Sequence, residues 1–356
     1  MAINLFTKYH GALVDALNYA NVLSGKTSNE FRWDGVKGIF LTSLKTVPLV
    51  DYNRTANPVA SSRYGTPVEV EDHQQYMELR KDRSIPLVID KGNYQEQGML
   101  KKAGKVIAAE INEQVAPELQ RYALAEYAKN AGQYATLTSG TPSVIIDLMN
   151  IEAMFANARI PKTERYVCVD ATYFPSLRAS MLPADNISDK LIMRGVVGRI
   201  GTLNIIETPH DDMPSNVVAL AWWKRAVLNP VTINETDLHT NPEGVSGALI
   251  NFRYRYDAFV VGMYANGVVA LLDANAQKVA ASAASTARVI TVASNTNVKY
   301  TTDGTDPRYS NSAKTLAASG TVSATEAPVG TVIKTVAVDP NGVKYPSAVS
   351  ETVVAS

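Results

Sequence analysis

The apolar residues between positions 100 and 122 constrain the fold of this chain more than any other feature. They recur at steps of three and four residues: Leu100, Ala103, Ile107, Ile111, Val115, Leu119 and Tyr122. This spacing places one apolar stripe along a helix and predicts a long helix with a single buried face. We expect it over residues 94–130, about 55 Å at about 1.5 Å per residue. Pro117 should kink it or mark a local defect.

Composition excludes several classes of protein. Hydrophobic residues make up 46% of the 356 residues and charged residues 19%, which supports a real core and argues against a disordered chain. The 34 basic and 34 acidic residues balance, so the basic excess of a dedicated nucleic-acid binder is absent. With Cys168 as the single cysteine, neither an internal disulfide nor a cysteine-based metal site can form. The first ten residues do not have the pattern of a secretory signal, and we expect a soluble chain of intracellular type.

The chain changes composition near residue 283. Every Phe, Trp and Met lies before Tyr264, whereas residues 284–356 are rich in Val, Thr and Ser. Short alternating runs separated by turn residues predict a small all-β sandwich there, preceded by the linker-like segment Ala280–Ser285.

A charged, extended arm is expected over residues 36–90. Between Asp51 and Lys91 lie seven acidic and six basic residues. We expect a long two-stranded arm with little apolar material, and such a ribbon needs a neighbour because isolated hairpins are marginal in water. The residues predicted to make intersubunit contacts are Glu69, Glu71, Glu78, Arg80, Lys81, Asp82 and Arg83. The alternative is a solvated run of charges.

The remainder of the first 283 residues is mixed α and β. A helix is expected over Phe6–Leu23 and another over Pro142–Ala158. Strands are expected at Arg165–Val169, Leu203–Glu207 and Val217–Trp222. Residues 253–272 are expected to form a hairpin that turns at Asn266-Gly267.

No catalytic, cofactor-binding or metal-binding group stands out. The segment around His73 could be drawn as a metal cluster, but a solvated or intersubunit face is the better interpretation, and His210-Asp211-Asp212 is interpreted as a polar turn. Cys168 lies in an apolar alternation and is expected to be a buried small hydrophobe. A phosphate loop and a Gly-x-Ser-x-Gly elbow are both missing from the sequence. The sequence thus argues against an enzyme.

Three glycines, Gly195, Gly198 and Gly201, turn the chain into the strand-like stretch Thr202–Ile206, and Pro209 follows soon after. With the charged arm and the long helix before them, this order of elements resembles the major capsid protein of tailed bacteriophages, the Hong Kong 97 fold. The resemblance covers about residues 1–280. It departs at Pro117 and in having no obvious fused scaffolding segment at the N-terminus.

The resemblance implies an α+β capsid shell domain at 1–283 followed by the sandwich at 284–356. Within the shell domain it implies an N-terminal arm at 1–35, an extended loop at 36–90, a spine helix at 94–130, and peripheral and axial parts at 142–283. The glycines would be structural turns.

The C-terminal segment resembles the immunoglobulin-like sandwich found at the C-terminus of chitobiases. The resemblance rests on the run from Val298 to Pro307, in which Asp303, Gly304, Asp306 and Pro307 form turns, and on Gly330–Val338. Such modules occur in proteins with many different activities, so this one does not indicate a particular activity. We expect it to project from the surface.

These resemblances imply a major capsid protein that assembles into hexamers and pentamers of an icosahedral shell in the virion, formed in the host bacterial cytoplasm. The implied partners are copies of itself, a scaffolding protein, a portal and decoration proteins. The shell would enclose double-stranded DNA without binding a specific sequence, and neither a membrane nor a cofactor is implied. The alternatives are an encapsulin-like nanocompartment shell, and a polysaccharide-active enzyme with an accessory immunoglobulin-like module.

Overall fold

The computed structural model describes residues 21–31, 33, 38–44, 49–55, 63–65, 67, 69–70, 72–91, 103–138, 144–175, 177, 196–240, 243–244, 246–273, 276 and 278–355. Most of the expected helix over Phe6–Leu23 lies outside the described residues. The chain forms two compact units, one of residues 1–37 and 78–277 and the other of residues 38–77 and 278–356.

A six-stranded sheet forms the centre of the first unit, in the order β4-β13-β8-β5-β7-β6. Its strands are β4 (Gln133–Thr136), β5 (Arg165–Asp170), β6 (Val196–Ile200), β7 (Leu203–Thr208), β8 (Val217–Trp223) and β13 (Val268–Leu272). The pairs β4–β13 and β5–β7 are parallel and the others antiparallel. Because β8 and β13 are buried along their whole length, they have the continuous hydrophobic sequence of strands covered on both faces.

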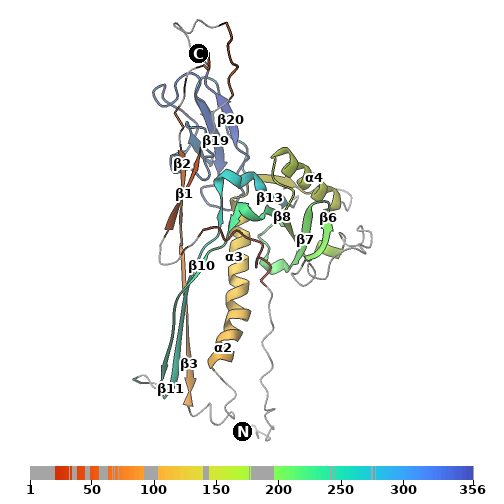
Figure 1. The fold of residues 1–356 in the computed structure, drawn as a ribbon, viewed down its shortest axis with the longest axis vertical. Helices are drawn as coiled ribbons and strands as arrows, with labels where there is room; N and C mark the ends of the chain where they lie inside the picture. Colours follow the sequence, from red (N-terminus) through yellow and green to blue (C-terminus); the bar gives the residue numbers. More distant parts are fainter. Residues whose placement is uncertain are drawn as a thin grey trace. The chain divides into compact units, whose positions relative to one another are not determined.

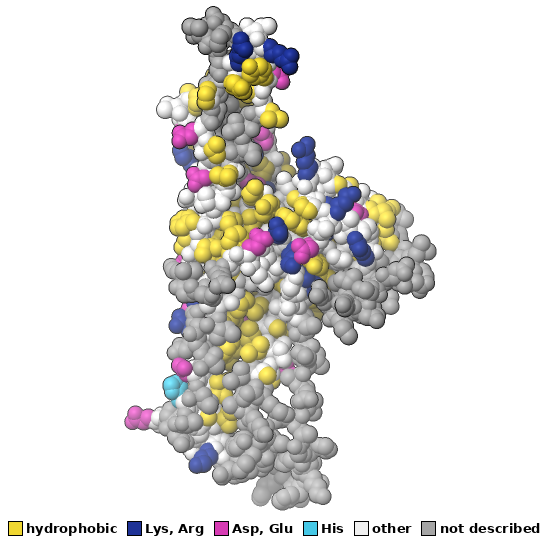
Figure 2. Space-filling model, viewed as in Figure 1, with side chains coloured by type: hydrophobic (Ala, Val, Ile, Leu, Met, Phe, Trp, Pro, Cys, Tyr) yellow, Lys and Arg dark blue, Asp and Glu magenta, His cyan; other side chains and the backbone are white. Residues whose placement is uncertain are grey.

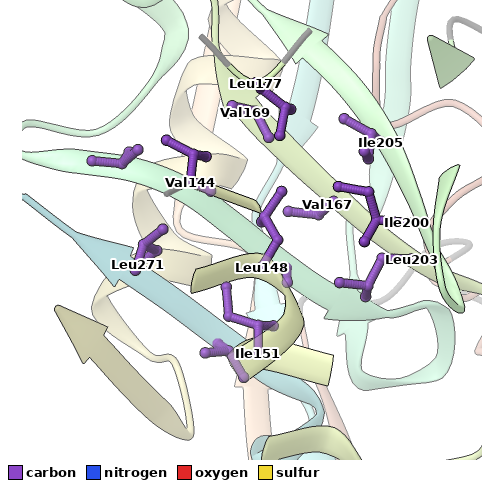
Figure 3. Close-up of a cluster of buried hydrophobic side chains, with 14 of the residues drawn as sticks. Val144, Leu148, Ile151, Val167, Val169, Leu177, Ile200, Leu203, Ile205 and Leu271 are labelled. Atoms are coloured by element: carbon purple, nitrogen blue, oxygen red, sulfur yellow. The ribbon is translucent and has the colours of Figure 1, made fainter. Parts of the chain in front are cut away.

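Helix α4 (Val144–Asn157) covers one face of this sheet. Leu148, Ile151 and Phe155 are fully buried against it. Figure 3 shows the side chains of α4 directed onto those of β5, β7 and β13. The strands expected near 165, 203 and 217 and the helix expected over residues 142–158 are thus confirmed.

Aromatic side chains fill the space between the sheet and the residues packed on its other face. The rings of Tyr127 and Trp222 lie 6.5 Å apart between centroids. The Tyr127 hydroxyl donates to the Leu228 carbonyl at 3.0 Å, and Trp222 Nε1 donates to the Lys26 carbonyl at 3.0 Å. The segment around Lys26 is therefore held on this unit.

A three-stranded antiparallel sheet, in the order β10-β11-β3, packs against the long helix. Its strands are β3 (Lys81–Asp90), β10 (Val231–Thr240) and β11 (Gly247–Tyr256). The helix consists of α2 (Ala103–Glu110), the π-helical turn η1 (Ile111–Val115) and α3 (Ala116–Lys129) in direct succession, as Figure 1 shows. Val115 and Leu119 of the predicted stripe pack on the alternate aromatic residues Phe252, Tyr254 and Tyr256.

The π-helical turn is the local defect expected at Pro117. Proline has no backbone N–H, so it cannot donate to the carbonyl of Glu113 as a regular helix would require. The N–H of Ala116 instead donates to the carbonyl of Ile111, five residues back. The helix ends as expected near Asn130, whose N–H donates to the carbonyl of Glu126 at 3.0 Å. Residues 94–102 lie outside the described part of the chain.

Two predictions of strand pairing were wrong. The expected two-stranded arm is divided, because β2 (Asp72–Glu78) pairs with β1 (Gly38–Leu44) while β3 pairs with β11. The expected hairpin over residues 253–272 does not form, because β11 and β13 belong to different sheets. Asn266-Gly267 ends the 3-10 helix η4 (Gly262–Gly267) instead of making a two-residue turn.

Short elements complete the first unit. They are the 3-10 helices η2 (His210–Asp212) and η3 (Lys224–Ala226) and the paired strands β9 (Val227–Leu228) and β12 (Phe259–Val260). Among the described residues, no helix is long and apolar enough to span a membrane.

The second unit contains β1, β2 and the C-terminal strands. These form two sheets, β14-β15-β18 and β17-β16-β19-β20. The strands are β14 (Ala283–Ala284), β15 (Val289–Thr291), β16 (Asn297–Thr301), β17 (Lys314–Leu316), β18 (Gly320–Thr321), β19 (Val332–Val338) and β20 (Ser350–Val353). Ile290, Val298 and Ile333, from both sheets, are fully buried in one core.

The linker-like interpretation of Ala280–Ser285 was wrong. Ala283 and Ala284 pair with Thr291 and Ile290. The buried Ser282 hydroxyl donates to Thr335 Oγ1 at 3.0 Å.

Candidate intersubunit surface

The charged residues at the root of the arm make a dense network within their own chain, centred on Asp257. The Arg80 guanidinium donates to both oxygens of this carboxylate, with Nε to Oδ2 at 2.8 Å and Nη2 to Oδ1 at 3.0 Å. The backbone N–H of Arg80 and the hydroxyl of Tyr122 donate to it as well, at 3.0 and 2.9 Å. Asp257 is fully buried, and these donors compensate for its desolvation.

Helix α3 supplies the rest of this network. Arg80 Nη2 also contacts Glu126 Oε2 at 3.1 Å. The hydrogen bond from Arg80 to Asp257 raises the pKa of the guanidinium, and burial raises the pKa of the Tyr122 hydroxyl. Both donors therefore stay protonated at any physiological pH.

Three further contacts connect β3 and β11 to Glu118, one helical turn before Tyr122. Arg83 Nε donates to Glu118 Oε1 at 3.1 Å, and the Tyr256 hydroxyl donates to the same oxygen at 2.6 Å. Tyr254 donates to Glu118 Oε2 at 3.2 Å, and burial raises its pKa to about 12. Glu118, Tyr122 and Glu126 are spaced by four residues, so they lie along one side of α3 and face the sheet together.

The remaining charges at this root are more exposed. Asp82 accepts two hydrogen bonds from Arg253, at 3.0 and 2.6 Å, and these bonds lower its pKa. The Lys81 ammonium lies 5.3 Å from the centroid of the Tyr122 ring. Glu78 is half-buried at the end of β2, Glu69 is exposed, and Glu71 lies outside the described residues.

Of the residues predicted to make intersubunit contacts, the structure thus brings Arg80, Lys81, Asp82 and Arg83 together and gives each a partner in its own chain. Their role between subunits stays a prediction. Sequence reasoning missed Asp257, Glu118 and Glu126 as partners. The four-residue spacing along the helix was the one signal that could have indicated the last two.

The arm itself carries a second feature that the sequence reasoning missed, an apolar surface. We call it the arm surface and define it by the exposed large hydrophobic residues Phe40, Leu44, Leu49, Val50, Tyr52, Tyr64, Val70 and Tyr76. Leu49 is 103% exposed and Tyr64 is 82% exposed, so both present most of their surface to the solvent. Hydrophobic and basic side chains lie together at the surface where residues 49–55 and 63–70 are found (Figures 1 and 2).

Aromatic pairs order the arm surface. The rings of Phe40 and Tyr76 lie 4.8 Å apart between centroids, and those of Tyr52 and Tyr64 lie 5.0 Å apart, edge to face. The N–H of Asn53 donates to the Arg63 carbonyl at 3.0 Å, which joins the two sides of the arm. The apolar groups are therefore presented in a defined arrangement, not as a loose chain.

The predicted structural turns occupy different environments. Gly201 joins β6 to β7 with a φ of +54°, and an added Cβ atom would lie 2.0 Å from Glu152 Oε2. Gly198 lies in β6 beside a register shift, and Gly195 is outside the described residues. Gly304 has a φ of +79°. Asp303 accepts from the N–H of Thr305 at 2.9 Å, Asp306 accepts from the N–H of Arg308 at 3.0 Å, and Pro307 between them is buried.

The buried position of Cys168 explains this residue without a reactive role. Cys168 is fully buried, and burial raises the pKa of its thiol to about 12, which confirms its interpretation as a small hydrophobe. In the part of the chain that the structure describes, no group of three His, Cys, Asp or Glu residues is arranged to hold a metal ion.

Neither known protein families nor curated sequences match this chain. Solved structures do. A chain of Mycobacterium phage Che8 is 17% identical with a TM-score of 0.57, and the match covers 76% of this chain and 98% of that one. A capsid chain of the cyanophage P-SCSP1u is 11% identical with a TM-score of 0.57, covering 77% and 94%. A chain from the mature capsid of bacteriophage PhiM1 is 11% identical with a TM-score of 0.51, covering 77% and 92%.

The chain therefore has the α+β fold of tailed-phage capsid structures, and the fold expected from the sequence is confirmed. The immunoglobulin-like identity of the C-terminal sheets stays a prediction.

Proposed function

We propose that this chain is the major capsid protein of a tailed bacteriophage, a structural protein without enzymatic activity. Copies of it would form hexamers and pentamers that close into an icosahedral shell around double-stranded DNA. Its place would then be the virion capsid, after assembly in the bacterial cytoplasm with a scaffolding protein and a portal. The fold shared with capsid chains supports this proposal.

The observation that carries the proposal is the arm surface. Eight of the 17 exposed large hydrophobic side chains among the described residues lie between positions 40 and 76. Clustered exposed hydrophobic residues of this kind mark interaction sites. Burying each would contribute about 1.5–3 kcal/mol, and in a shell the same contact is repeated in every subunit.

The charged residues at the root of the arm would then determine which neighbouring subunit is bound, and in which register, more than how tightly it is bound. Glu69, Glu71, Glu78, Arg80, Lys81, Asp82 and Arg83 stay our proposed intersubunit residues. Because Arg80 and Arg83 already have partners in their own chain, contact with a neighbour would require them to share or exchange these partners. The balanced net charge suits a wall that encloses DNA without binding it tightly.

We also propose that residues 284–356 form an immunoglobulin-like module that projects from a shell domain of residues 1–283. About a quarter of this chain is left uncovered by the capsid structures, a share close in length to the module. A buried core drawn from both C-terminal sheets supports a sandwich.

The test compares particle yield for a variant of the arm surface and a matched control. The variant carries Leu49→Ser and Tyr64→Ser, and the control carries Val343→Ser, a residue that is 78% exposed in the loop between β19 and β20. Sedimentation and negative-stain microscopy measure the yield, and circular dichroism measures folding. We expect both variants to fold, and the yield of the first to fall at least about tenfold because lost burial is repeated at every contact.

Normal yield from the variant of the arm surface would contradict the proposal. Arg83→Glu, assayed in parallel, separates the two contributions, since loss of assembly in this variant alone would assign the contact to charge. DNA inside wild-type particles supports a phage capsid, whereas a protein cargo would indicate a compartment shell.

A further inference from the structure

An open groove of about 400 Å³ lies at the ends of β5 and β7 in the first unit. Its lining includes Asp170, Tyr173, His210, Asp211 and Asp273. The groove thus gathers three carboxylates and one imidazole, contributed by the end of β5, by η2 and by the residue after β13. None of these groups takes part in the arm surface or in the network around Asp257.

The contact between His210 and Asp170 is the shortest ion pair of the groove. His210 Nδ1 lies 2.6 Å from Asp170 Oδ2. The Asp170 side chain is only 3% exposed, whereas that of His210 is 69% exposed. The other oxygen of Asp170 accepts from the N–H of Thr172 at 2.9 Å. A buried carboxylate is therefore paired with an imidazole that the solvent can reach, and the pair is ionic when that imidazole is protonated.

The other side of η2 is attached to the long helix. Arg121 Nε donates to the Asp211 carbonyl at 3.0 Å, and Arg121 Nη2 lies 3.4 Å from Asp212 Oδ1. Gln120, itself fully buried, donates to Asp212 Oδ2 at 3.1 Å. Residues 210–212 thus connect β5 to α3, with His210 on one side and Asp212 on the other.

The charges that face His210 favour its protonated form. Its hydrogen bond to Asp170 raises the pKa of His210 above the ordinary value of 6.5, and the nearby Asp211 acts in the same direction. Asp273 and Tyr173 face it across the groove, and Arg121 is the cation on the helix side of η2. Burial alone would raise the pKa of Asp170, but hydrogen bonds from Thr172 and His210 lower it.

The direction of the pH dependence follows from these shifts. The contribution of the charged pair is complete below pH 6.5, the ordinary pKa of His210. It is lost as the pH rises through the raised pKa of His210 in the folded protein. Neutral imidazole can still donate a hydrogen bond to Asp170, but its charge is gone and the groove keeps its carboxylates.

We propose that His210 and Asp170 form a proton-dependent clasp that holds the loop of residues 209–217 against the end of β5. With His210 protonated the clasp is closed, and η2 fixes the sheet to the long helix. With His210 neutral the clasp loosens and the loop opens more often. The device is a pH sensor built into the first unit, and it does not rest on the proposed function.

Hydrogen exchange measured by mass spectrometry on the full chain tests this inference. Peptides covering residues 208–217 are compared at about pH 6 and about pH 8.5, with exchange times adjusted for the intrinsic rate. We expect the loop of the wild-type protein to lose protection at the higher pH by about two- to fivefold, the range of an exposed ion pair. His210→Gln should show the weaker protection at both pH values.

His239→Gln is the matched control. His239 is also exposed, on β10, and its replacement should leave the pH dependence of residues 208–217 as in the wild type. Equal protection of the wild-type loop at both pH values would overturn the proposal, as would an unchanged pH dependence in His210→Gln. If that variant does not fold, His210→Asn and the chemical shift of the His210 ring across the same pH range decide the question.

Discussion

At the scale of the residue, Asp257 connects elements of the first unit that lie far apart in the sequence, although no sequence signal singles it out. Its carboxylate accepts hydrogen bonds from the backbone and side chain of Arg80, from Tyr122 and from the N–H of Ala258. A buried acceptor with this many donors is costly to remove, because the donors that are themselves buried, such as the N–H of Ala258, lose the carboxylate and cannot bond to water instead.

Replacement of Asp257 by Ala should lower the free energy of unfolding by about 2–4 kcal/mol, since it leaves the buried N–H of Ala258 and the half-buried Tyr122 hydroxyl without this acceptor. Denaturant unfolding of the full chain under non-assembling conditions measures this change. The matched control is Asp82→Ala, because Asp82 pairs with Arg253 at a surface where both side chains are 40% or more exposed. That substitution should lower the free energy of unfolding by no more than about 1 kcal/mol. If both variants lowered the free energy of unfolding by the same amount, the burial of Asp257 would not be the reason that its network stabilises the protein.

At the scale of the element, the long helix is stabilised mainly by the apolar face that it packs against β11. Leu119 and Val115 fill the space over the alternate tyrosines of β11. The π-helical turn before Pro117 is accommodated without loss of this contact. Packing of the apolar stripe, more than helix propensity, therefore stabilises the element.

Leu119→Ala should lower the free energy of unfolding by about 2–4 kcal/mol through the cavity that it leaves. Glu113→Ala is the control, because Glu113 is exposed on the same helix, and we expect a change within about 0.5 kcal/mol. Thermal or urea unfolding compares the two. A small effect of Leu119→Ala would mean that the stripe is not the main contact of the helix.

At the scale of the whole molecule, the C-terminal sheets carry a core of their own. Its buried residues are Ile290, Val298, Tyr300, Val322, Ala327, Ile333 and Val354. A chain that ends at residue 277 should keep the six-stranded sheet and assemble, and residues 278–356 alone should unfold cooperatively, because each core draws on its own residues. Circular dichroism of both fragments and microscopy of the first provide the measurement. An insoluble or unassembled first fragment would show that the module is integral to the shell.

Local pattern predicted the elements well. The step of three and four residues predicted the long helix, and the alternation of Arg165–Val169 predicted β5. In the C-terminal segment two of the short alternating runs form the strands β16 and β19. Pro117 indicated the helix defect because its missing N–H is a property of the residue itself.

Partners distant in the sequence were not predictable in the same way. β3 pairs with β11, so that Lys81 lies opposite Tyr256, and no local signal distinguishes this partner from β2. Asp257 could not be identified as a buried acceptor either, because its burial depends on Arg80 and Tyr122 being brought to it by separate elements. The apolar residues of the arm were visible in the sequence, but their exposure was not.

The sequence by itself determined the periodicities, the turns and the order of elements, and these sufficed for the fold class. Each is set by the backbone geometry and polarity of neighbouring residues. Only the tertiary structure decided which strands pair, which carboxylate is buried and which hydrophobic residues stay exposed. Those properties depend on contacts between separate segments, more than a hundred residues apart for β3 with β11 and for Arg80 with Asp257, and such contacts leave no periodic trace in either segment.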